Sequence, residues 1–202
     1  MATTSLQSLP LAIKFCKKTC KTCGLDIYQG PALERAKEAQ IFWVGLSAVM
    51  FKEGQEKLPL SPLKSSGALI HSIEAPLRPI FSFYKTNLVK CAPIEDDKVR
   101  YPLTHEMEKC FPNFEWELKH LHPKVVLLLG KQVADFVLKR FDLPKVTLAE
   151  HFQYHMFLID GTYFVPVHHP SYMLIYKRRY IQQYINGIQD LISKSICPKK
   201  GQ

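Results

Sequence analysis

Short apolar runs alternate along this chain with segments of helical pattern, and that alternation restricts the fold more than any other feature. The runs predict three buried strands, at residues 41–44, 88–89 and 125–129. The segments between and beside them predict helices, at residues 31–38, 66–73, 104–120 and 131–141. Strands that alternate with helices are typical of an α/β domain with parallel strands and right-handed crossovers.

The last third of the chain predicts a hairpin and a long helix. Apolar runs at 156–159 and 163–167 are split by Asp160 and Gly161, a turn that joins two neighbouring strands. Apolar residues then recur at helical spacing from Ile181 to Ile192, with polar residues on the opposite face. We expect this apolar stripe to pack on the core.

Length and charge limit the class of protein. The 202 residues suffice for one well-packed domain, and 47% of them are hydrophobic, which excludes a chain that is disordered throughout. The longest apolar stretch, residues 125–129, is far shorter than the roughly 18 residues that cross a bilayer. We therefore expect a cytoplasmic protein, associated with the nucleoid. The 27 Lys and Arg exceed the 18 Asp and Glu by nine, which favours polyanionic partners such as nucleic acid.

The six cysteines include a closely spaced N-terminal group. Cys16, Cys20 and Cys23 lie within eight residues, and the last two are spaced so that both sulfur atoms can face one metal. Cys91 and Cys110 follow much later, with 18 residues between them. In a reducing compartment such cysteines are metal ligands, a redox pair or unligated thiols rather than disulfides. The spacing leaves zinc and an iron–sulfur cluster equally open.

Small and polar residues lie at or next to the ends of the predicted strands. They form four segments, at residues 45–48, 86–87, 130–131 and 168–171. Ligands of parallel sheets bind beyond the carboxyl ends of the strands, so these segments are expected to converge on one cleft.

In this order the segments resemble the uracil-DNA glycosylase superfamily, specifically its iron–sulfur members in families 4 and 5. The resemblance extends from about residue 16 to about residue 194 and depends on a series of motifs rather than on one. The matching motifs are Cys-Lys-Thr-Cys at 20–23, Gly-Leu-Ser-Ala at 45–48, Thr-Asn-Leu-Val-Lys-Cys-Ala-Pro at 86–93, Glu106 with Cys110, Pro-Lys-Val-Val-Leu-Leu-Leu-Gly at 123–130 and His-Pro-Ser at 169–171.

The resemblance implies one three-layer α/β/α domain with a central, mainly parallel four-stranded sheet. This domain would occupy residues 16–195, between tails at 1–15 and 196–202, and would be a monomer.

The same resemblance implies a four-iron four-sulfur cluster with a mainly structural role. Its ligands would be Cys20, Cys23, Cys91 and Cys110. Cys16 and Cys197 are left over, and Cys16 is placed so that it could replace Cys20. The spacing between Cys91 and Cys110 is slightly longer than in the family, so we expect an additional loop around residues 95–100.

The resemblance also implies that the chain flips a nucleotide out of DNA and cleaves its glycosidic bond. The expected catalytic residues are His169, which would donate a hydrogen bond to the base as negative charge develops, and Asn87, which would read the base edge. The residues expected to bind the base are Gly45, Leu46, Ser47, Ala48, Leu60 and Asn87. Those expected to bind DNA are Ser66, Gly67, Lys131, Ser171, Lys177 and Arg178.

Two positions depart from family 4. Leu46 stands where family 4 carries a glutamate, so the group that activates water is unassigned, and Glu53 and Glu56 are the nearest substitutes. Leu60 stands near the position of an aromatic residue that stacks on uracil, which leaves Phe51 as an aromatic candidate.

These departures give three hypotheses about function. The first is a DNA glycosylase that releases uracil or another modified base, including a bulky base of modified phage DNA. The second is an iron–sulfur module that binds damaged DNA with little turnover. The third, a zinc-stabilised RNA-binding protein, accounts for the charge and the cysteine pair but not for Asn87 and His169 in this order.

Overall fold

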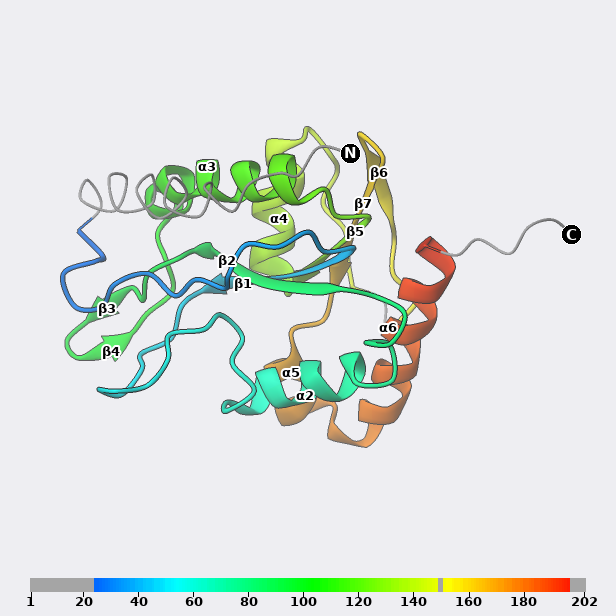
Figure 1. The fold of residues 1–202 in the computed structure, drawn as a ribbon, viewed down its shortest axis with the longest axis horizontal. Coiled ribbons are helices and arrows are strands. Elements are labelled where there is room, and N and C mark those ends of the chain that lie inside the picture. The colour runs from blue at the N-terminus through cyan, green and yellow to red at the C-terminus, as the bar shows by residue number, and fades with distance from the viewer. Residues whose placement is uncertain (1–23, 149–150, 197–202) are drawn as a thin grey trace, which may run out of the picture.

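Five strands form the central sheet of the computed structural model, which describes residues 24–148 and 151–196 (Figure 1). Their order is β2-β1-β5-β7-β6, and all neighbours are parallel except β6 and β7. The strand bounds are β1 Ile41–Ser47, β2 Phe83–Val89, β5 Val125–Leu129, β6 Phe157–Ile159 and β7 Thr162–Val167. The mainly parallel sheet is confirmed, with one strand more than the four expected, because the hairpin at Asp160 and Gly161 adds β6 to the edge.

Helices cover both faces of this sheet. Ile41 and Trp43 of β1 face a core that includes α2, α5 and α6, whereas Phe42 and Val44 face a core that includes α3 and α4. The helix bounds are α2 Ser65–Glu74, α3 Thr104–Leu121, α4 Lys131–Arg140, α5 Pro170–Tyr176 and α6 Ile181–Ile196. Figure 1 shows the two helix layers on opposite sides of the sheet, which confirms the three-layer architecture. None of the described helices combines the length and the apolar character that a membrane span needs.

The helices predicted at 66–73, 104–120 and 131–141 are confirmed to within one residue, but the helix predicted at 31–38 is wrong. This segment instead follows the outer side of β2. The Ala32 amide donates to the Lys90 carbonyl at 2.8 Å, and the Glu34 carboxylate accepts a hydrogen bond from the Lys85 amide at 2.7 Å. Because β2 is an edge strand, its outward backbone groups need partners, and this need outweighs the local helical pattern.

A small second sheet precedes α3. β3, Ile94–Glu95, pairs antiparallel with β4, Lys98–Val99, through a turn in which Asp96 and Asp97 both have positive φ, 49° and 56°. This hairpin lies where an additional loop is expected, around residues 95–100. The four remaining cysteines, Cys16, Cys20, Cys23 and Cys197, lie outside the described residues.

Candidate active site

A cavity of about 830 Å³ opens beyond the carboxyl ends of β1, β2, β5 and β7, and each of the four predicted segments contributes to its wall. The predicted residues in the wall are Gly45, Leu46, Ser47, Ala48, Leu60, Ser66, Gly67, Asn87, Lys131, His169 and Ser171. Lys177 and Arg178 are not part of the wall. They follow α5, where a short 3₁₀ turn, Arg178–Tyr180, leads into α6.

Asn87 lies on β2 directly opposite Gly45 of β1. Its side chain is buried, and a Cβ atom at position 45 would collide with Asn87 Oδ1. The absence of a side chain at Gly45 therefore makes room for the side-chain amide of Asn87. No hydrogen bond joins the side-chain amide of Asn87 to another described residue. Its NH₂ donor and its oxygen acceptor are therefore available to a ligand in the cavity.

His169 is the N-cap residue of α5, and its ring is held in one orientation. The Ser171 amide donates to His169 Nδ1 at 3.1 Å. A backbone amide can only donate, so Nδ1 carries a lone pair and the proton of the neutral ring is on Nε2. Burial lowers the pKa of the His169 imidazole, which keeps it neutral at pH 7. The site thus contains a fixed Nε2–H donor.

Gly130 makes space for this histidine. It follows β5 with a φ of 87°, a conformation that favours glycine, and a Cβ atom there would lie 3.2 Å from His169 Cβ. Pro170, the first residue of α5, fixes the start of the helix that His169 caps.

The helices α2 and α5 meet at the floor of the site. Ser66 Oγ and Ser171 Oγ share a hydrogen bond of 2.7 Å. One residue later, Gly67 packs directly on the loop before α2, where a Cβ atom would collide with the carbonyl oxygens of Leu60 and Ser61. Leu60 itself has a φ of 50° and packs close to Gly45. These contacts fix the distance between the loop and the two helices.

The cavity wall carries positive but no negative side chains among the residues described. Lys64, Arg100 and Lys131 contribute to it, and no Asp or Glu does, so neither Glu53 nor Glu56 replaces the glutamate missing at Leu46. Phe51 is in the wall, as suggested for an aromatic substitute.

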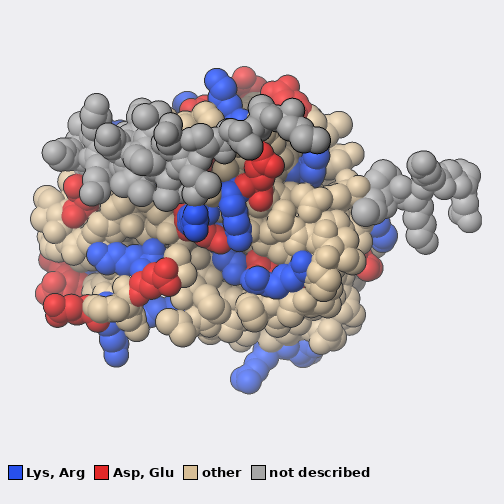
Figure 2. Space-filling view, in the orientation of Figure 1, with Lys and Arg blue, Asp and Glu red and all other residues tan. Residues whose placement is uncertain are grey.

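On the described part of the face in Figure 2, Lys and Arg side chains alternate with Asp and Glu rather than forming one continuous basic surface.

The sequence pattern missed one part of the wall. Val99, Arg100 and Tyr101 reach the cavity from the β3–β4 hairpin and the segment after it. Arg100 is fixed by a bidentate ion pair with the buried Glu106, at 2.6 and 2.9 Å, which lowers the pKa of Glu106. Tyr101 next to it is 71% exposed. Only the long Cys91–Cys110 spacing pointed to this segment.

The neighbouring histidine has a packing role. His168 Nδ1 and the Tyr154 hydroxyl lie 2.9 Å apart, and the His168 ring stacks on Tyr172 at a centroid distance of 5.5 Å. It is absent from the cavity wall among the described residues. His168 therefore packs beside the site without lining it.

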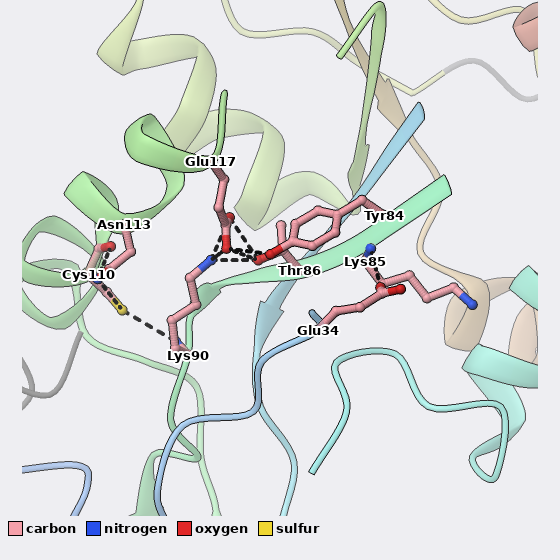
Figure 3. Close-up of polar contacts among 8 residues, drawn as sticks. All are labelled: Glu34, Tyr84, Lys85, Thr86, Lys90, Cys110, Asn113 and Glu117. Carbon is pink, nitrogen blue, oxygen red and sulfur yellow. Dashed lines mark hydrogen bonds and ion pairs between the residues drawn. The ribbon is translucent and has the colours of Figure 1, made fainter. Parts of the chain in front are cut away.

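The two described cysteines lie together in the interior. Cys91 and Cys110 are buried and belong to one small apolar cluster with Leu25 and Val89. The Lys90 amide donates to Cys110 Sγ at 3.3 Å (Figure 3). Buried sulfur atoms that accept amide hydrogen bonds suit a thiolate-ligated cluster. Leu25, which follows Cys23 by two residues in the sequence, also belongs to this cluster. Within the described residues no three metal-binding side chains come together.

Comparison with known proteins places this geometry in a family. The model of the uracil DNA glycosylase superfamily matches residues 29–191. The chain belongs to this superfamily. The match includes Gly45, Asn87, Gly130 and His169, which all line the cavity.

A curated member of the superfamily gives a shorter match. Over 66 residues the chain is 35% identical to the type-4 uracil-DNA glycosylase of Archaeoglobus fulgidus. These matched residues make up 33% of this chain and 32% of that protein. The chain thus spans about a third of the length of this relative.

Proposed function

We propose that the protein is a DNA N-glycosylase that takes a flipped-out uracil or other modified base into the cavity and hydrolyses its glycosidic bond, leaving an abasic site. The observation that carries this proposal is that Asn87 and His169 line the same cavity in a member of the uracil DNA glycosylase superfamily. An amide provides a donor and an acceptor for the base edge, and a fixed Nε2–H provides a donor for the base oxygen.

The proposed chemistry depends on stabilising the departing base. Breaking the bond leaves positive charge on the sugar and negative charge on the base, and donors already aimed at that charge lower the barrier. The neutral His169 ring donates from Nε2 to the base oxygen, while Asn87 holds the base edge. Lys64 adds positive potential at the wall, whereas Lys131 is paired with Asp135 at 2.8 Å. Because this bond cleavage creates both charges, we expect departure of the base to limit the rate.

We further propose that Cys91 and Cys110, together with Cys20 and Cys23, hold a four-iron four-sulfur cluster. The type-4 relative supports this at the level of the family, and the burial of Cys91 and Cys110 and the hydrogen bond to Cys110 Sγ suit it. Such a cluster would serve as a structural cross-link between the N-terminal segment and the β2–α3 region. The cleavage chemistry proposed above does not pass through it.

Rate-limiting departure of the base gives a prediction about substrates. Release of 5-fluorouracil should be about tenfold faster than release of uracil, because fluorine makes the departing base more acidic at nearly constant size. Single-turnover release from otherwise identical oligonucleotides measures this ratio. Equal rates for the two bases would show that departure of the base does not limit the reaction.

The base itself is tested with a panel. Duplexes and single strands that carry uracil, hypoxanthine, 5-hydroxymethylcytosine or glucosylated hydroxymethylcytosine should be assayed for abasic sites. A cavity of about 830 Å³, with Leu60 where family 4 stacks an aromatic residue, favours release of bases larger than uracil. Efficient release of uracil alone would contradict that part of the proposal.

The absence of a described carboxylate from the wall also favours the second candidate, an iron–sulfur module that binds damaged DNA with little turnover. It predicts tight binding of the same oligonucleotides without abasic sites.

DNA contacts are proposed for the segment after α5. Ile175 and Tyr176 are largely exposed at the cavity, and Lys177 and Arg178 follow directly. Reversing both charges, Lys177→Glu with Arg178→Glu, should weaken binding and reduce the slope of log Kd against log salt by about two, one for each lost phosphate contact. Binding titrations at several salt concentrations measure the slope.

The matched control for this change is Lys119→Glu with Lys124→Glu. Both lysines are exposed, Lys124 precedes β5 at the end of the sheet opposite the cavity, and the pair alters the net charge equally. The same loss of slope in both double variants would remove Lys177 and Arg178 from the interface.

A further inference from the structure

A fully buried ion pair connects β2 with α3. Lys90 Nζ lies 2.7 Å from Glu117 Oε2 and 2.8 Å from Oε1, and the two side chains are only 1% and 6% exposed (Figure 3). The proposed cleavage uses neither residue. Burying two charges is costly, and apolar residues of similar size would often stabilise a protein equally well, so the pair needs another explanation.

The remaining hydrogen bonds of this pair come from the same strand. The Thr86 hydroxyl lies 2.9 and 3.0 Å from the two Glu117 oxygens and also contacts Lys90 Nζ. The Tyr84 hydroxyl donates to Glu117 Oε1 at 3.1 Å. Glu117 thus receives donors from three residues of or next to β2, and only one register of α3 on the strand satisfies them all.

The same two elements carry the described cysteines. Cys91 follows Lys90 in the chain, and the Lys90 amide donates to Cys110 Sγ. Cys110 and Glu117 are seven residues apart on α3, which places them on one face of the helix two turns apart. Asn113 between them donates to the Cys110 carbonyl at 3.0 Å and contacts Sγ at 3.8 Å.

We infer that Lys90, Glu117 and Thr86 form a positioning lock that fixes the register of α3 on β2 and thereby holds Cys91 and Cys110 at the geometry of a metal cluster. The inference rests on the proposed role of these cysteines as cluster ligands. The lock acts through the backbone: the ion pair sets the helix position, and the helix position sets Cys110 Sγ against the Lys90 amide.

The test compares two buried carboxylates. Glu117→Gln removes the negative charge of the lock and leaves the Lys90 ammonium without its counter-ion. Glu74→Gln makes the same chemical change in α2, where Glu74 is fully buried and pairs with Arg78 and Lys85 at 2.7 and 3.1 Å.

Both variants are purified as the full chain, and the decay of the visible iron–sulfur absorbance is followed under an oxidant and a chelator. Glu117→Gln should lose its cluster about tenfold to a hundredfold faster than the wild type. Glu74→Gln should stay within about twofold of it.

A second pair of variants, with smaller changes, is used if Glu117→Gln does not fold. Thr86→Val removes only the bridging hydroxyl, and its control is Thr162→Val, which removes a hydroxyl that donates to the Pro123 carbonyl at 2.8 Å on β7. The Thr86 variant should lose the cluster several-fold faster than its control. If the purified chain carries no cluster, the rate at which a thiol reagent labels the Cys110 peptide replaces the absorbance, because loosening of α3 exposes that buried sulfur.

Equal rates for the lock variants and their controls, in absorbance or in labelling, would overturn the inference. The result is independent of the glycosylase assay. A wild-type protein that holds its cluster but releases no base would contradict the proposed activity and leave the inference about the lock standing. An active protein in which the lock variants lose the cluster as slowly as their controls would contradict only the inference about the lock.

Discussion

Replacing His169 with alanine should lower the single-turnover rate of base release by about 10²–10³-fold, the effect of removing one donor aimed at the developing negative charge. The ring is partly buried, neutral and held through Nδ1 so that Nε2–H is its donor. The measurement is abasic-site formation on an oligonucleotide that the wild type processes, with enzyme in excess.

Two controls separate chemistry from folding in this experiment. His168→Ala removes the neighbouring ring, which packs on Tyr154 and Tyr172 instead of lining the cavity, and it should retain the rate within about tenfold. His169→Asn keeps a good N-cap residue for α5, so it should lose the activity without the roughly 1 kcal/mol of stability that His169→Ala loses with the cap. A His169→Ala variant that releases base at the wild-type rate would contradict the proposed mechanism.

Gly67→Ala should reduce the free energy of unfolding by about 1–3 kcal/mol, the range for overpacking a tightly filled site. Alanine is the better helix former by about 1 kcal/mol, but the new methyl group would collide with the backbone carbonyls of Leu60 and Ser61. Backbone atoms cannot rotate away as a side chain can, so α2 and the loop must separate. Denaturant unfolding measures the loss.

The control for this substitution is Gly30→Ala, because a Cβ atom at Gly30 has no neighbour within 4 Å. It should change the free energy of unfolding by no more than about 0.5 kcal/mol. Because Leu60 and Ser66 both line the cavity, Gly67→Ala should also weaken substrate binding. Unchanged stability would show that the loop and α2 can separate at little cost.

The parts of the fold that could be predicted are those whose side chains repeat with a clear period. Residues 125–129 form a run that is buried on both faces of the sheet, and they are a strand as expected. β2 is longer than its two predicted residues, because Lys85, Thr86 and Asn87 interrupt its apolar pattern. Those polar residues are in the strand because each serves a contact: an ion pair, the lock and the cavity wall.

The candidate site could be located because parallel strands present their carboxyl ends at one edge of the sheet. Asn87 and His169 are far apart in the sequence and still meet at one cavity. Residues 99–101 could not be placed, since nothing local shows that a hairpin folds back to that edge. Likewise no pattern in the sequence pairs Lys90 with Glu117, because that contact depends on how α3 packs on β2.

The segment along the outer side of β2 has a consequence for solubility. Ala32 and Glu34 occupy backbone groups of an edge strand that would otherwise be open to pairing with another chain. Burial raises the pKa of Glu34, so mild acid protonates this carboxylate before an exposed one and weakens its hold on the Lys85 amide. A chain shortened past residue 34, or one held at low pH, is therefore prone to edge-to-edge self-association even while its central sheet remains folded.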